Sequence, residues 1–191
     1  NGVTLIHEAH YVNVSEKEGK LYSRVNAYTI PKEEVQGTIY GDSIRDQHVN
    51  IPAGETVTEW TRCVMNKDID LLFMASHTHQ LGTNFSAKRF DGENVVGDVF
   101  YSTDDWHDPY IMKFEEPMFI PAGEGFEYSC TWKNTTDALV EYGSTAEHEM
   151  CNLTLVHTPG DFDICCEVVD SSDGEMWVKP GEKCAASTAG N

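Results

Sequence analysis

Short segments in which apolar and polar residues alternate recur along this chain, and they constrain its fold more than any other feature. A two-residue period places alternate side chains on opposite faces, which is typical of half-buried β-strands, and few windows show the 3.6-residue period of a helix. Glycine, proline, aspartate and asparagine separate the segments, as turns between short strands require. The pattern predicts an all-β chain, an antiparallel β-sandwich of jelly-roll type with a single domain. The alternating segments are 21–30, 56–65, 71–76, 95–101, 125–132 and 151–157.

The predicted domain covers residues 1–170. The remainder, 171–191, is rich in Ser, Gly, Ala, Asp and Glu and is predicted to be an irregular tail, which Cys184 could tie to the domain by a disulfide. One short helix is predicted to begin at Pro31, because proline is favoured at the first position of a helix.

The number and spacing of the cysteines indicate the cellular compartment in which the chain is located. No two cysteines have the Cys-x-x-Cys spacing, so structural zinc is disfavoured, and an even number favours disulfides whose pairing the spacing leaves open. Four Asn-x-Ser/Thr triplets make glycosylation plausible in a eukaryotic source. Together these features favour an extracytoplasmic location, secreted or periplasmic. The cysteines are Cys63, Cys130, Cys151, Cys165, Cys166 and Cys184, and the triplets begin at Asn13, Asn84, Asn134 and Asn152.

The charge of the chain excludes two classes of partner. Its 191 residues contain 13 Lys and Arg against 32 Asp and Glu, a formal net charge of −19. Such a chain is repelled by a nucleic-acid backbone and by an anionic membrane surface. No apolar run approaches the roughly 20 residues that a membrane-spanning helix needs. The chain is therefore expected to have no nucleic-acid partner and no membrane span, while its charge does not identify a ligand.

A candidate metal site follows one of the predicted strands. The apolar run 71–76 leads directly into His77, Thr78 and His79. In a strand, His77 and His79 point to the same side with Cα atoms roughly 6.5–7 Å apart, so two imidazoles could converge on one metal. Imidazole suits Zn, Cu, Fe and Ni alike. The alternative interpretation is a pair of surface histidines without a ligand.

A third ligand is suggested by Met150, which immediately precedes Cys151 at the start of another predicted strand. A thioether is a soft ligand and selects copper, especially Cu(I). Methionine is more often a core residue, which is the alternative here. In a regular strand Cys151 faces away from Met150, which suits a disulfide better than a thiolate ligand.

These motifs, in this order, resemble those of the copper type II, ascorbate-dependent monooxygenases, which include peptidylglycine α-hydroxylating monooxygenase and dopamine β-monooxygenase. The resemblance runs from about Leu5 to Cys166. It is carried by His77-Thr78-His79-Gln80-Leu81-Gly82, Gly143-Ser144-Thr145 and Glu149-Met150-Cys151-Asn152-Leu153, with His10-Tyr11, Ile51-Pro52-Ala53-Gly54 and Cys63 also fitting.

The resemblance implies a function and a set of site residues. The family has two jelly-roll domains with one copper each, and this chain is similar to the second, whose copper binds oxygen and faces a small-molecule substrate. It implies one copper per chain, with ascorbate or another reductant, and a first copper domain upstream or on another chain. The implied copper ligands and catalytic residues are His77, His79 and Met150. The implied disulfides are Cys130 with Cys151 and Cys63 with Cys165 or Cys166. The remaining one of these two is left for Cys184, a pairing that this sequence adds to the family pattern.

Two departures from the family pattern matter. The adjacent His-His pair of the first family domain is absent, and the other histidines, His7, His10, His48, His107, His148 and His157, show no such grouping. The arginine and tyrosine that clamp a peptide carboxylate in the peptidylglycine enzyme are replaced by Ala75 and Thr154. Without a guanidinium there, a peptide C-terminus has no evident anchor.

Three functions are therefore compared. The leading prediction is the oxygen- and substrate-binding part of a copper monooxygenase that hydroxylates a C–H bond. The alternative is a non-catalytic copper-binding domain for storage, delivery or sensing. A blue-copper electron carrier is a third, but it needs a thiolate ligand, and the orientation expected for Cys151 disfavours it.

Overall fold

The computed structural model describes residues 7, 9, 11, 17–20, 22–161 and 163–174. The chain divides into two compact units, Asn1–Gln36 and Gly37–Asn191. In the first unit the 3₁₀-helix η1 (Lys32–Glu34) follows Pro31, as predicted. The predicted strand over 21–30 does not form in residues 22–30, where Tyr22 is 89 % and Tyr28 94 % exposed. Alternation alone does not make a strand without a partner strand to accept its hydrogen bonds.

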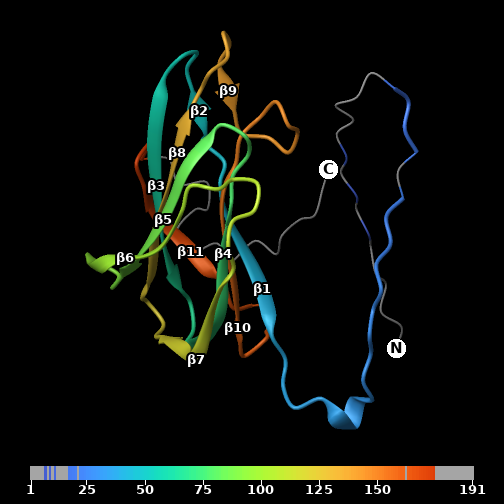
Figure 1. Ribbon diagram of the computed structural model, residues 1–191. Helices are drawn as coiled ribbons and strands as arrows, with labels where there is room; N and C mark the ends of the chain where they lie inside the picture. The colour runs from blue at the N-terminus through green and yellow to red at the C-terminus, as the bar shows by residue number, and fades with distance from the viewer. Residues whose placement is uncertain are drawn as a thin grey trace. The chain divides into compact units, whose positions relative to one another are not determined.

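The second unit is built of antiparallel β-sheets, which confirms the predicted all-β sandwich. One sheet has four strands in the order β1-β10-β4-β7, and the other has five in the order β11-β3-β8-β5-β6. Figure 1 shows the two sheets as two layers. The strands are β1 (Tyr40–Asp46), β2 (Asn50–Ile51), β3 (Thr56–Met65), β4 (Ile69–His77), β5 (Gly82–Phe90), β6 (Val95–Thr103), β7 (Met112–Ile120), β8 (Gly125–Lys133), β9 (Val140–Glu141), β10 (Cys151–Thr158) and β11 (Cys166–Ser171).

The core lies between the two sheets and is filled by the inward residues of each strand. In β8, for example, Phe126, Tyr128 and Trp132 are fully buried. Phe85 stacks on Tyr128 with ring centroids 5.9 Å apart. Each such side chain contributes about 1.5–3 kcal/mol on burial. The two-residue alternation in the sequence thus fixes which face of each strand enters the core. In the described residues, no helix is long and apolar enough to cross a membrane.

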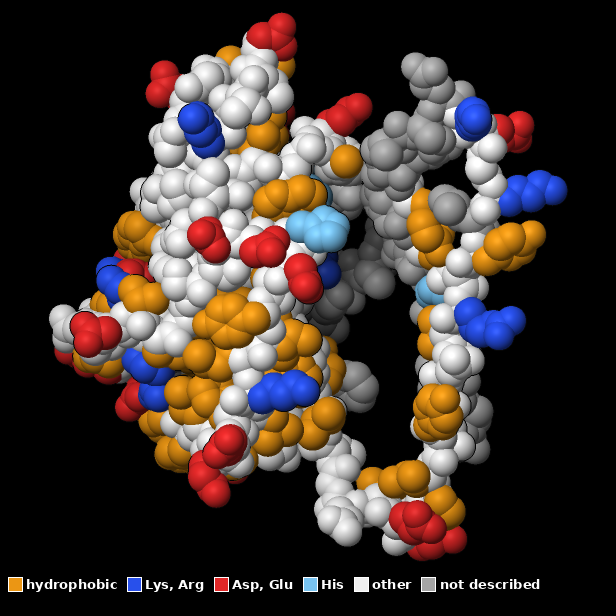
Figure 2. Space-filling view, in the orientation of Figure 1, with side chains coloured by type: hydrophobic (Ala, Val, Ile, Leu, Met, Phe, Trp, Pro, Cys, Tyr) orange, Lys and Arg blue, Asp and Glu red, His pale blue; other side chains and the backbone are white. Residues whose placement is uncertain are grey.

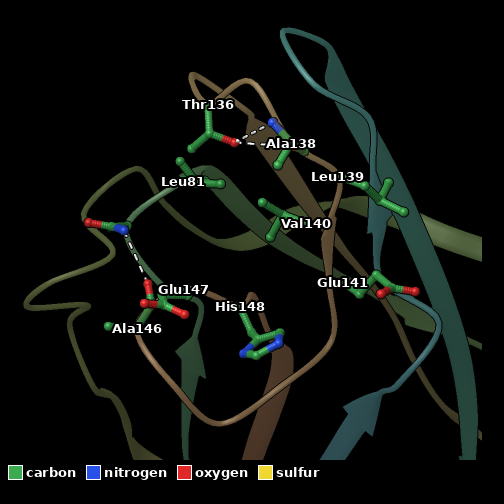
Figure 3. A pocket seen from close by; sticks show the side chains of 10 residues that line it. Leu81, Thr136, Ala138, Leu139, Val140, Glu141, Ala146, Glu147 and His148 are labelled. Carbon is green, nitrogen blue, oxygen red and sulfur yellow. Dashed lines mark hydrogen bonds between the residues drawn. The ribbon is translucent and has the colours of Figure 1, made fainter.

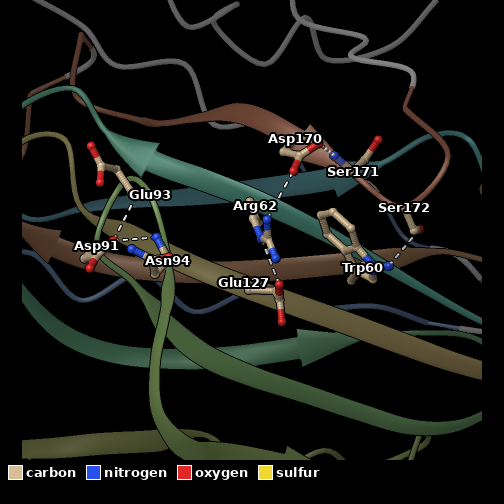
Figure 4. Close-up of polar contacts among 9 residues, drawn as sticks. All are labelled: Trp60, Arg62, Asp91, Glu93, Asn94, Glu127, Asp170, Ser171 and Ser172. Carbon is tan, nitrogen blue, oxygen red and sulfur yellow. Dashed lines mark hydrogen bonds and ion pairs between the residues drawn. The ribbon is translucent and has the colours of Figure 1, made fainter.

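Polar contacts organise the outer face of the five-stranded sheet. The Arg62 guanidinium lies 4.4 Å from the centre of the Trp60 ring. Its Nε donates to Glu127 at 2.8 Å, and its Nη1 donates to Asp170 at 3.2 Å. Figure 4 shows Arg62 between these two carboxylates. One arginine therefore links β3 to its two neighbours, β8 and β11.

Exposed apolar side chains gather at the edge of the fold formed by β6, β7 and the loop between them. Figure 2 shows hydrophobic side chains gathered over the lower half of the sheets in this view. Contiguous exposed apolar side chains are typical of contact surfaces. The exposed members from this region are Val96, Val99, Trp106, Tyr110, Ile111 and Phe119.

Disulfides join Cys130 to Cys151 and Cys63 to Cys166, which confirms one predicted pair and selects between the two alternatives for Cys63. Cys165 is also disulfide-bonded, and Cys184, its expected partner, lies outside the described residues, as does the predicted tail from residue 175 onward. The Cys130–Cys151 bond connects β8 to β10 and therefore crosses between the sheets. Closing a loop of this size contributes about 3 kcal/mol on the chain-entropy model.

The asparagines of the glycosylation triplets differ in how exposed they are. Asn134 is 1 % exposed and donates to the carbonyls of Ile51 and Ala138, and Asn152 is 6 % exposed. Asn84 on β5 is exposed, and Asn13 lies outside the described residues.

A chain secreted from a eukaryotic host is therefore expected to carry a glycan at Asn84 and none at Asn134 or Asn152, because a glycan at either buried position would prevent the native packing. Glycopeptide mapping after enzymatic deglycosylation would measure this, and Asn84→Gln should remove the glycan mass. A folded protein glycosylated at Asn134 or Asn152 would contradict the expectation.

Candidate metal centre

His77 and His79 lie side by side at the end of β4. Alternation along β4 buries Met74 and Ser76 and leaves His77 at the surface as the last residue of the strand. His79 follows in the turn, and the two imidazole centroids are 5.1 Å apart with their planes at 77°. The apolar strand thus delivers both rings to one place at the edge of the sheet.

The hydrogen bond of the His79 ring and the pKa of His77 suit metal binding. Nδ1 of His79 lies 2.8 Å from the His148 carbonyl and donates to it, which leaves Nε2 as the nitrogen that could bind a metal. Partial desolvation, and then repulsion from His79, lower the pKa of His77. A lowered pKa favours the neutral imidazole, which is the form that binds a metal.

Met150 lies on the same face of the sheet as His77. In the β10–β4 pair Asn152 is directly opposite His77, and directly opposite residues share a face. The Nδ2 of Asn152 lies 3.3 Å from the sulfur of Met150, which places that thioether on this face as well. Met150, one residue before β10, is half-buried, while Leu153 and Leu155 of β10 enter the core. Two imidazoles and a thioether are a donor set that suits copper, Cu(I) in particular.

Glu149 ties the two ligand-bearing segments together. Its side chain is fully buried, and its carboxylate accepts from the backbone N–H of His79 at 2.8 Å, Leu81 at 2.7 Å and Met150 at 3.3 Å. Burial raises the pKa of Glu149, and the N–H groups of Leu81 and His79 oppose that shift. Sequence reasoning missed this role, although an acidic residue next to a candidate ligand was a signal that could have prompted it.

Arg45 also lies on the face that carries the histidines. It is directly opposite Asn152 in the β1–β10 pair, so Arg45, Asn152 and His77 form one row across three strands. The next row contains Thr154 and Ala75, the two positions at which the carboxylate clamp was expected to be missing. No sequence motif indicates Arg45, because the register that places it depends on which strands pair.

His148 contributes to this region through its backbone carbonyl, and its ring has other partners. Its Nδ1 lies 2.6 Å from the Thr145 hydroxyl. The ring covers Gly143, where an added Cβ would come within 2.5 Å of it, so glycine is required there. The ring lines a cavity of about 410 Å³ together with Leu81 and Val140, as Figure 3 shows.

Of the other described histidines in the second unit, His157, His107 and His48 are not brought to this site. His157 is fully buried, its Nδ1 lies 3.1 Å from the Pro159 carbonyl, and burial lowers its pKa. His107 is exposed, its ring packing against Trp106. His48 lies 3.4 Å from Asp173, and His7 contacts Ser23 in the first unit. His10 lies outside the described residues.

Comparison with known proteins identifies the family. The family model for the copper type II ascorbate-dependent monooxygenase C-terminal domain matches residues 37–175, and the chain belongs to this family. The match includes all the strands described above. A search of curated proteins finds no match. Membership implies dependence on copper and ascorbate, and the disulfides fit an extracytoplasmic location.

Proposed function

We propose that this chain is the oxygen- and substrate-binding copper domain of a monooxygenase that hydroxylates a C–H bond, with His77, His79 and Met150 as the copper ligands. The observation that carries the proposal is the position of two imidazoles and a thioether on one sheet face in a member of this copper family. When bound, copper would supply the chemistry that activates dioxygen, with ascorbate or another reductant as the electron source.

The residues of the chain hold this centre and present a face to the substrate. His148 orients the ring of His79, and Glu149 anchors the backbone on both sides. A small-molecule substrate would lie against the sheet face beside His77. There the buried Oδ1 of Asn152 has no hydrogen-bond partner among the described residues, so it is available to a substrate donor.

Other parts of the proposal concern the whole protein. The chain is proposed to be secreted or periplasmic, with a domain over 1–170 and a tail over 171–191. A first copper domain, upstream or on another chain, would supply the second electron that hydroxylation requires. The exposed apolar side chains of β6 and β7 are a candidate surface for its contact.

A blue-copper site is disfavoured, because it needs a thiolate ligand and Cys151 is in a disulfide. A non-catalytic copper domain would have the same ligands. It would differ in showing no hydroxylation when the reductant and a first copper domain are both supplied.

Met150→Leu tests the ligand set. The wild-type chain is expected to bind one Cu(I) in preference to Zn(II), and the variant to bind Cu(I) about tenfold more weakly or worse, a loss of ~1.4 kcal/mol, because the thioether selects the soft ion. Zn(II) affinity should change little. Titration against a chromogenic Cu(I) chelator measures both, with Met118→Leu on β7 as a matched control. Displacement of Cu(I) from the reduced protein by an equal concentration of zinc would contradict the proposal.

A further inference from the structure

A second group of ligating side chains lies at the end of β1, apart from the histidine pair. Asp46 is the last residue of β1, His48 follows it, and Asp173 lies in the turn after β11. One ligand atom from each lies within 4.8 Å of the other two, and Nδ1 of His48 is 3.4 Å from Oδ2 of Asp173. Three segments distant in the sequence therefore bring an imidazole and two carboxylates together.

Negative charge accumulates at Asp46 and Glu59, for which the described residues provide no lysine or arginine partner. Asp46 is 4 % exposed, and the Oε2 of Glu59 is buried with no hydrogen-bond partner in the described part of the chain. Burial, and then the charges of Asp46 and Asp173, raise the pKa of Glu59 to about 7. Buried carboxylates are normally paired or bound to a metal.

A buried hydroxyl without a well-placed hydrogen-bond partner lies near Asp46. The Thr61 hydroxyl donates to Oδ2 of Asp46 at 3.2 Å. The Tyr128 side chain is fully buried beside Thr61, and its hydroxyl has no hydrogen-bond partner of good geometry among the described residues. Burial, together with the negative charge of Asp46, raises the pKa of Tyr128. An unsatisfied buried hydroxyl next to a buried carboxylate is a feature that an additional bound ion accounts for.

An approach to the group exists from the surface. His48 lines a cavity of about 380 Å³ with Asn50, Glu141 and Tyr142. The side chains of His48 and Asp173 are 27 % and 28 % exposed, so both reach the surface of the protein. A zinc ion bound at about 2.0–2.2 Å holds its ligand atoms roughly 3.3–3.6 Å apart. The distance between Nδ1 of His48 and Oδ2 of Asp173 already falls in this range. A shift of these two side chains would bring their ligand atoms equally close to the Asp46 carboxylate.

We propose that Asp46, His48 and Asp173 bind a divalent cation of the zinc type, with Glu59 adjacent as a further carboxylate. One imidazole and hard carboxylate oxygens suit Zn²⁺, whereas two imidazoles and a thioether suit Cu(I). The ion would neutralise the charge buried at the end of β1. This site is independent of the proposed copper ligands, so either assignment can fail without the other.

Zinc titration of the full chain in a His77→Ala/His79→Ala background tests the proposal, because that background removes the other imidazole pair. Calorimetry should find one Zn²⁺ per chain, and zinc should raise the melting temperature, since an ion that binds only the folded state stabilises it. Asp173→Asn and His48→Gln, introduced separately, should each weaken binding at least about tenfold.

Matched controls keep the test decisive. Asp163→Asn and His107→Gln remove exposed groups of the same types elsewhere and should leave zinc binding unchanged. Glu59→Gln should weaken binding without removing a ligand of the main group. The proposal is overturned if the background chain binds no zinc, or if Asp173→Asn and His48→Gln bind it as tightly as the two controls.

Discussion

Replacing either His77 or His79 with alanine is expected to abolish copper binding. Only three side chains are proposed to hold the ion, so each variant leaves one imidazole and one thioether, too few for a stable site. His77 is an exposed strand end, and its loss should leave the fold intact. Copper content after dialysis against a chelator, with circular dichroism to check the fold, measures the effect.

The matched control for these variants is His107→Ala, since His107 is exposed and lies in another loop. It should retain one copper per chain. If a folded His77→Ala or His79→Ala chain also retained one copper after dialysis, the ligand assignment would be wrong.

Glu149→Ala is expected to destabilise the protein by about 3 kcal/mol or more and to weaken Cu(I) binding. The substitution leaves the N–H groups of His79, Leu81 and Met150 without their acceptor, and each buried unsatisfied donor costs about 1–3 kcal/mol. The segments that carry His79 and Met150 are then no longer held together by the carboxylate. Copper binding must also order these segments, which weakens it. Urea unfolding and Cu(I) competition titration would measure the two losses.

Glu149→Gln should be intermediate, because its one carbonyl oxygen replaces only part of the carboxylate. Glu147→Ala, at an exposed glutamate two residues away, is the matched control and should behave as wild type. Equal stability and equal Cu(I) affinity for Glu149→Ala and Glu147→Ala would show that the carboxylate does not position the ligands.

The parts of the structure that sequence predicted are those set by local pattern. Alternation over 56–65 and 125–132 matches β3 and β8, and the proline before Lys32 precedes a short helix. The all-β class follows from such segments together. The Cys130–Cys151 disulfide was expected from the family resemblance, since spacing does not specify pairing.

The parts that sequence did not predict depend on strand register and on long-range contacts. Arg45 reaches the histidine face only because β1 pairs with β10. The grouping of His48 with Asp173 requires the turn after β11 to meet the end of β1. Residues 22–30 carry a strand-like pattern and form no strand, because alternation does not reveal whether a partner is present.

The position of β10 has a consequence for how the proposed centre exchanges metal. β10 is an inner strand, hydrogen-bonded to β1 on one side and β4 on the other, and its first residue is covalently joined to the opposite sheet. Local opening in such a fold begins at edge strands, where fewer hydrogen bonds must break. The backbone of β10, which begins one residue after Met150, should therefore be among the slowest to exchange its amide hydrogens. Metal would then enter and leave by side-chain rotation at the surface, on a timescale independent of fraying at the sheet edges.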